Sequence, residues 1–145
     1  MWLVEGLLAG LIAGIVMGIA TEIGYRLGLL KANLLVVDGS FALRLMNRSE
    51  SNVAMYALGI VIHCVTSAVF GIAYVILAKL FGFDTRLILA IVIYVLVLWI
   101  AMLCIALPVA GQGIIGKKIS GVVWAEQLVL HVVFGLSFWW ALGLI

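Results

Sequence analysis

The chain has very little charge. Only 10% of its 145 residues are Asp, Glu, Lys or Arg, and 68% are hydrophobic, whereas an ordinary globular domain carries about 25% charged residues. Proline occurs once, and histidine and cysteine occur twice each. This composition excludes an ordinary soluble domain and predicts a protein that lies in lipid.

The scarcity of polar residues excludes further classes of function. The basic residues are spread over three loops and form no stripe, so we expect no nucleic-acid partner. No serine or cysteine stands with a base and an orienting acid, so nothing supports hydrolase chemistry. Because the chain has very little soluble mass, we expect it to have no catalytic activity of its own. Cys64 and Cys104 differ in predicted depth by roughly 10 Å, which is too far for a disulfide.

What the sequence does contain is four long apolar runs. A hydrocarbon core about 30 Å thick requires roughly 20 apolar residues per helical span, and the runs at about 2–23, 53–78, 87–108 and 122–144 meet that length. The longest connection, 26–52, is too short for a second domain. We therefore expect an all-α integral membrane four-helix bundle that forms one transmembrane domain over 1–145, with the lipid bilayer as its first partner.

The distribution of basic residues predicts the orientation of these spans. Six of them lie in the first and third loops, against Lys79 and Arg86 in the second. The positive-inside rule then places the first and third loops in the cytoplasm and both termini outside. Within the first loop, we expect a short helix on the inner membrane surface that begins at Asp38 or Ser40.

Small residues recur at helical spacing in the first span. Gly6, Gly10, Gly14 and Gly18 are four residues apart and form a glycine zipper. Such a stripe lets another helix approach closely where lipid supplies no hydrophobic drive. We expect it to serve contact with other membrane-protein subunits or self-association of the chain.

The only two histidines lie at similar predicted depths, near the middle of the second and fourth spans. Each shares a helical face with small or polar residues, which directs it towards protein; these stripes are Gly59, His63, Ser67 and Gly71, and Gln127, His131 and Gly135.

Three interpretations of the histidines stay open. His63 and His131 are candidate axial ligands of a haem b, with Gly59, Ser67 and Gly135 making room for the edge of the ring. Alternatively, each histidine is neutral and hydrogen-bonded across a helix interface, or the two belong to a proton relay. A protein-only metal site is not expected, because zinc requires three or four ligands.

Glu126 is a candidate member of such a relay, since it lies about one turn inside the fourth span. It does not share a helical face with His131, five residues away. Before it, the segment "GQGIIGKK" matches a dinucleotide fingerprint by its letters but follows a membrane span and not a strand. We expect its glycines to form a tight turn and Lys117 and Lys118 to contact lipid headgroups.

An imperfect repeat relates the two halves of the chain. The letters "AVFG" follow His63 and "VVFG" follow His131, although the Phe-Gly pair comes one helical turn later in the first case. This pattern admits an origin by duplication of a helical hairpin.

The order of the glycine-rich first span, "HCVTSAVFGIAYVIL", "LPVAGQGIIG" and "LVLHVVFG" resembles small four-span bacterial and archaeal membrane proteins of the DUF6789 and YagU (DUF1440) group. The resemblance implies a four-helix fold and a prokaryotic plasma membrane, and no activity. It marks these positions as the matching ones: His63, Gly71, Pro108, Gly111, Gly113, Gly116, His131 and Gly135.

Three functions follow as expectations. The first is a non-catalytic subunit or assembly module of a larger membrane complex, such as a respiratory or other redox complex. The second is a bis-histidine haem b electron carrier that uses His63 and His131. The third is a small transporter or proton-conducting protein with Glu126 and the histidines along its path.

Overall fold

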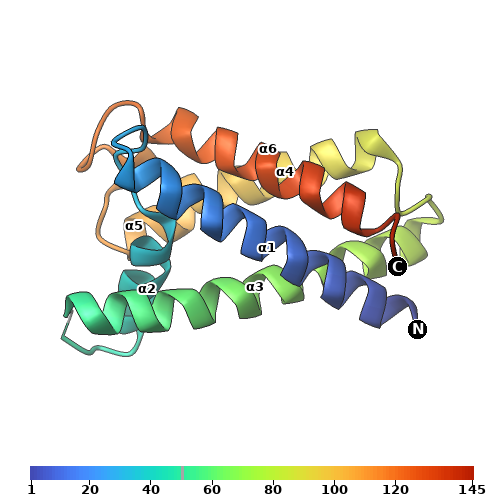
Figure 1. Cartoon of the computed structure of the whole chain (residues 1–145), viewed down its shortest axis with the longest axis horizontal. Helices are drawn as coiled ribbons and strands as arrows, with labels where there is room; N and C mark the ends of the chain where they lie inside the picture. Colours follow the sequence, from blue (N-terminus) through green and yellow to red (C-terminus); the bar gives the residue numbers. More distant parts are fainter. Residues whose placement is uncertain (50) are drawn as a thin grey trace.

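The protein is entirely helical over the residues that its computed structural model describes, 1–49 and 51–145 (Figure 1). The helices in chain order are α1 (Trp2–Arg26), α2 (Leu34–Leu45), α3 (Asn52–Phe81), α4 (Ile88–Ala101), the π-helix η1 (Met102–Ala106), α5 (Leu107–Val109), the 3₁₀ turn η2 (Ile114–Gly116) and α6 (Val123–Ala141).

Three helical segments are long and apolar enough to cross a membrane. They are Trp2–Arg26, Asn52–Phe81 and Ile88–Val109, and each agrees with a predicted span to within three residues at either end. The fourth predicted span forms α6, which is 19 residues long and carries Glu126, Gln127 and His131. It is not one of the three, because these polar residues lower the hydropathy of a short helix.

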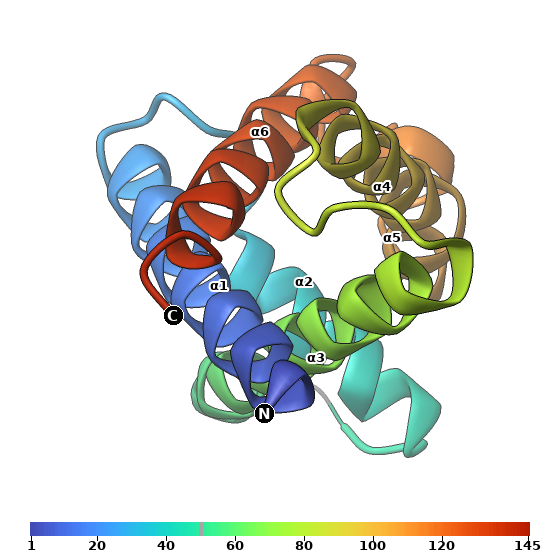
Figure 2. The same cartoon turned by 90° about the vertical axis from the view of Figure 1, so that its right-hand side faces the viewer.

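The long helices α1, α3, α4 and α6 are arranged in a ring, and α2 lies across it towards one end (Figure 2). Helix α1 packs against α3 and α6, α2 packs against α3, and α4 packs against α6. Both termini and the turn at 82–87 lie at one end of the molecule, and the other loops lie at the opposite end (Figure 1). The two loops that carry most of the basic residues therefore share an end.

The glycines of α1 bring its backbone close to that of α3. A Cβ added at Gly6 would lie 2.7 Å from the carbonyl oxygen of Gly71, and one at Gly10 would lie 2.9 Å from the Gly71 Cα. Both distances are shorter than real contacts of a Cβ atom, so only glycine fits. Gly6, Gly10, Gly14 and Gly18 are all buried, and the single chain covers this stripe itself.

Helix α2 differs from the predicted surface helix. Asn33 caps it by accepting a hydrogen bond from the Leu35 N–H at 3.0 Å, so the predicted starts at Asp38 and Ser40 are wrong. The helix is inserted into the bundle, with Val37 only 2% exposed and Ser40 only 1% exposed. It fits there because Gly39 lies directly against the backbone of Met55 on α3.

The glycines predicted to form a turn lie between α5 and α6. Gly111, Gly113 and Gly116 have φ angles of 80°, 75° and 74°, and Ile115 also has a positive φ of 62°. Residues with side chains rarely adopt this region. The guanidinium of Arg44 lies over Gly111, close to where a Cβ would be, and thereby connects α2 to this turn.

The π-helix η1 precedes Pro108, which has no backbone N–H and cannot donate to the carbonyl four residues earlier. A wide turn at Met102–Ala106 accommodates this loss. Such turns inside α-helices are frequent at functional sites, and this one forms part of a cavity wall.

Candidate functional site

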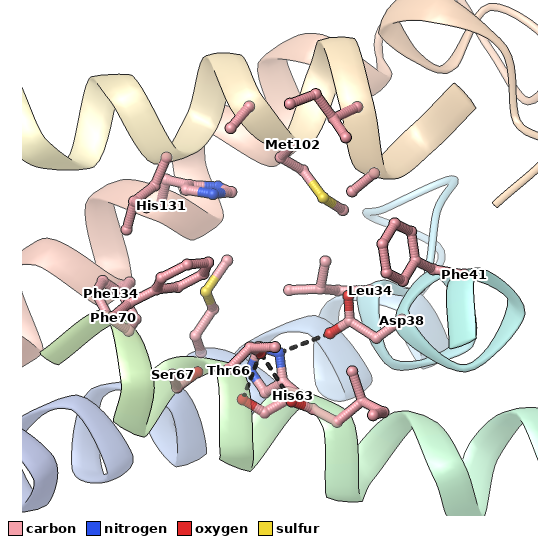
Figure 3. Close-up of a pocket in the computed structure, with 16 residues that line it drawn as sticks. Leu34, Asp38, Phe41, His63, Thr66, Ser67, Phe70, Met102, His131 and Phe134 are labelled. Carbon is pink, nitrogen blue, oxygen red and sulfur yellow. Dashed lines mark hydrogen bonds and ion pairs between the residues drawn. The ribbon is translucent and has the colours of Figure 1, made fainter. Parts of the chain in front are cut away.

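A carboxylate and an imidazole form a pair inside the bundle. Asp38 Oδ2 of α2 lies 2.9 Å from His63 Nδ1 of α3, and the other ring nitrogen, Nε2, lies 3.0 Å from the carbonyl oxygen of Gly14 on α1. His63 is only 6% exposed. One imidazole therefore connects three helices, and Figure 3 shows its contact with Asp38.

The hydrogen bonds require that the pair hold one proton between its facing atoms. A carbonyl oxygen only accepts, so His63 Nε2 carries a proton and donates to Gly14. At 2.9 Å, Nδ1 and the Asp38 oxygen then need a second proton between them, because two bare acceptors at this distance would repel. The pair is either a neutral acid with a neutral imidazole or a carboxylate with an imidazolium.

Burial favours retention of that proton. Removal of the carboxyl from water raises the pKa of Asp38, and the hydrogen bond and charge of His63 offset this effect only in part. Asp38 therefore keeps a proton to a higher pH than an exposed aspartate does.

The Asp38–His63 pair lies in the wall of a cavity of about 240 Å³. Both histidines line it, together with Thr66 and Ser67, and most other lining side chains are apolar or aromatic, including Met17, Leu34, Phe41, Phe70, Met102 and Phe134. A cavity of about 150 Å³ holds a benzene molecule, so this one has room for a small aromatic compound.

His131 of α6 projects into the same cavity from the opposite wall (Figure 3). Its Nδ1 donates to the Gln127 carbonyl oxygen at 2.8 Å, so in the neutral ring Nε2 has no proton. That nitrogen presents a lone pair, which can accept a hydrogen bond.

The cavity opens between α3 and α4. The exposed side chains of the described lining are Phe70 on α3 and Ile105 on η1, which continues α4, and they are 39% and 59% exposed. Their main packing is elsewhere, against α1 and α2 for α3 and against α6 for α4. One bridge between them is the Tyr94 hydroxyl, which donates to the Phe70 carbonyl oxygen at 2.8 Å.

The geometry of His63 favours hydrogen bonding over ligation of a haem iron. An axial ligand needs a free ring nitrogen, and both nitrogens of His63 have protein partners. Of the small residues expected around the ring, Ser67 lines the cavity, but Gly59 lies against Leu35 of α2 and Gly135 against Val95 of α4. Only His131 has the free nitrogen that a ligand requires.

Glu126 does not approach the histidines and contacts the loop after α1. Its Oε2 accepts hydrogen bonds from the backbone N–H groups of Lys31 and Ala32, at 2.9 and 3.2 Å. The carboxylate thus joins α6 to the start of α2. Lys117 and Lys118 lie in the exposed turn before α6, as their predicted role at headgroups requires.

Two polar features were missed by the sequence analysis. Asp38 was considered only as a helix cap, although its place inside the apolar run "LLVVDGSFAL" is a signal for a buried acid with a partner. The second feature is the Asn33 side-chain amide, which donates to Glu22 and to Tyr56 at 2.8 and 2.9 Å. It ties α1, α2 and α3 together beside the loop end of the bundle.

Comparison with family models, with curated proteins and with solved structures finds no match to this chain.

Proposed function

We propose that the protein is a small proton-linked membrane transporter that takes a lipophilic small molecule into the cavity between α3 and α4. The observation that carries this proposal is the position of the Asp38–His63 pair, whose facing atoms lie 2.9 Å apart in the wall of a cavity of about 240 Å³. Polar ionisable groups at such positions are expensive to bury and are typical of proton and substrate pathways.

The proposed membrane arrangement has four spans, formed by α1, α3, α4 with η1 and α5, and α6. Both termini lie outside and α2 lies near the cytoplasmic side, in a prokaryotic plasma membrane. Arg26 ends α1, Lys31 follows it, Arg44 lies in the last turn of α2, and Lys117 and Lys118 lie in the turn before α6. These segments share one end of the molecule (Figure 1), which supports this orientation. The opening between α3 and α4 then faces the acyl chains, and a lipophilic compound enters without crossing water.

A transporter of this kind couples ligand binding to the proton because both use the same pair. A ligand that contacts Asp38 changes the relative stability of the protonated and deprotonated forms, and by linkage the proton changes the affinity for the ligand equally. Glu126, the earlier relay candidate, would act in this scheme as a structural tie between α6 and α2.

The test is proton flux in proteoliposomes that contain a trapped pH-sensitive dye. Aromatic compounds of positive, neutral and negative charge are added outside, and wild-type protein is compared with Asp38→Asn. We expect at least one compound to move protons with wild type and not with the variant. Equal flux in both, or in vesicles without protein, would overturn the proposal. Asp84→Asn is the matched control, because Asp84 is exposed at the far end.

A second candidate is a subunit of a larger membrane complex, and the outer face of α4 favours it. Ile93, Val97 and Ile100 on this face are 54%, 56% and 52% exposed, and they would accept either acyl chains or a partner helix. Purification from native membranes in a mild detergent, followed by mass spectrometry, tests this candidate. Self-association through Gly6, Gly10, Gly14 and Gly18 would have to displace α3, so an added subunit fits α4 better.

A further inference from the structure

The polar groups that face the cavity are mainly hydrogen-bond acceptors. The hydroxyl proton of Thr66 is committed to the Ile62 carbonyl oxygen at 2.8 Å, and the Nδ1 proton of His131 is committed to Gln127. Asp38 presents a carboxyl group whose nearest partner is His63. Ser67 alone adds a hydroxyl that can also donate. A ligand with donors fits this wall better than one with acceptors.

The titratable residues that line the cavity favour a positively charged ligand over a negatively charged one. Asp38 from α2, His63 from α3 and His131 from α6 are the titratable residues among those that line it, and the lining residues from α1, α4 and η1 carry none. No Lys or Arg belongs to this described lining. An anion would therefore face a carboxyl group without a fixed counter-charge, whereas a cation would find a partner in Asp38.

Aromatic rings complete this environment. Phe41 lies on the same helix as Asp38, one turn away, and Phe70 and Phe134 lie towards His131 (Figure 3). The faces of aromatic rings attract cations, and this attraction grows when water is excluded. The same rings also offer apolar contact to the hydrocarbon part of a ligand.

We propose that the ligand is a lipophilic organic ammonium ion that replaces the proton shared by Asp38 and His63. This inference rests on the proposed function and names its substrate class. One proton leaves the pair for water as one cation binds, so the net charge of the site is unchanged. The ammonium N–H groups donate to the Asp38 carboxylate and to the acceptors around it, and the apolar part lies among the phenylalanines.

The experiment uses three probes of similar size and different charge: 2-phenylethylammonium, 2-phenylethanol and 3-phenylpropionate. Binding to the purified full-length protein in detergent is measured by calorimetry between pH 5.5 and 7.5, where an alkylamine stays protonated. Each titration is repeated in two buffers with different heats of ionisation, which gives the number of protons released.

We expect the ammonium to bind most tightly, with release of up to one proton and with an affinity that rises by up to about tenfold per pH unit. Asp38→Asn should weaken its binding by at least about tenfold, while the matched Asp84→Asn should not. Ala106 also lines the cavity. Ala106→Phe leaves Asp38 in the chain and should weaken binding because the larger side chain takes up space in the cavity. The result then does not depend on whether the Asp38 variant folds.

Two outcomes separate this inference from the proposed function. Suppose that 2-phenylethanol and the ammonium bind equally and that proton exchange requires Asp38. This result would overturn the inference that the ligand is a cation, but it would still support a proton-linked binding site. If wild-type protein binds none of the three probes, or if neither Asp38→Asn nor Ala106→Phe changes the binding, both the inference and the proposed function would be overturned.

Discussion

His63 Nε2 donates a hydrogen bond to the carbonyl oxygen of Gly14, 49 residues earlier in the chain, at 3.0 Å. This bond keeps a proton on Nε2 and directs the other ring nitrogen, Nδ1, towards Asp38. The contact exists because α1 has no side chain at this point: a Cβ at Gly14 would overlap the side chain of Ser67. The glycine packing of α1 and the chemistry of the pair thus depend on one another.

The stability of the protein should fall as pH rises through the titration of Asp38. The pKa of this carboxyl is raised in the folded protein, chiefly by burial. In the unfolded chain the pKa of an aspartate is about 3.9. The folded state therefore binds the proton more tightly, and this contribution is complete below pH about 4 and is lost at higher pH. Asp38→Asn should flatten the pH dependence of the thermal midpoint. An unchanged profile in the variant would assign the dependence to other groups.

Gly71→Ala should destabilise the protein by about 1–3 kcal/mol, because the new methyl group would meet the backbone of Gly6 and Gly10 and force α1 from α3. Thermal unfolding in one detergent measures the loss. Gly121→Ala is the matched control, since nothing lies within 4 Å of its added Cβ, and it should leave the midpoint unchanged. Equal midpoints for the two variants would mean that the helices separate easily.

The three apolar spans were predictable because their lengths and composition are local properties of the sequence. For the packing of α1 against α3, the sequence predicted a close helix neighbour but not which helix it is. Four-residue spacing showed that Gly6 and Gly10 admit a close neighbour, but it could not show that the neighbour is Gly71 of the same chain. The glycine stripes of α1 and α3 lie far apart in the sequence, and only the folded structure shows that they pack against each other. The sequence alone therefore could not exclude self-association of the chain through the α1 stripe.

The sequence predicted the orientation of the two histidines but not their hydrogen-bonding partners. Periodicity placed His63 and His131 on inward faces, and both line one cavity. Their bonding partners depend on tertiary contacts: Asp38 is 25 residues from His63 and comes into range only because α2 is inserted into the bundle. A surface position for α2 would have left Asp38 in water, and the sequence analysis therefore missed it.

Gln127 is the clearest candidate for a stabilising substitution. It is fully buried, and both polar atoms of its side-chain amide lack a partner in the part of the chain that the structure describes. An unpaired buried amide costs about 1–3 kcal/mol, so Gln127→Met, of similar size, should raise the thermal midpoint. A lower midpoint would reveal that the amide has a partner, such as a bound molecule, in the isolated protein.

The proposed orientation predicts which positions react from outside the cell. With Cys64 and Cys104 replaced by serine, Leu144→Cys should react with a membrane-impermeant maleimide on intact cells, because the C-terminus lies outside. Gly121→Cys, in the exposed turn before α6, should react only after permeabilisation. The reverse pattern would invert the topology, and reaction of both positions on intact cells would remove α6 as a span.

The two histidines should differ strongly when each is replaced by leucine. His63→Leu removes a ring that joins α1, α2 and α3 and leaves Asp38, whose side chain is only 17% exposed, without its partner, which should cost on the order of 3 kcal/mol. His131→Leu loses one hydrogen bond to its own helix and should cost about 1 kcal/mol. Thermal unfolding measures both, and absorption spectra of the same preparations test the haem interpretation. We expect a colourless wild-type protein and unequal stability of the two variants, because both ring nitrogens of His63 are hydrogen-bonded and one nitrogen of His131 is free. A Soret band in the wild type that disappears in both variants would instead show that the two histidines are equivalent haem ligands.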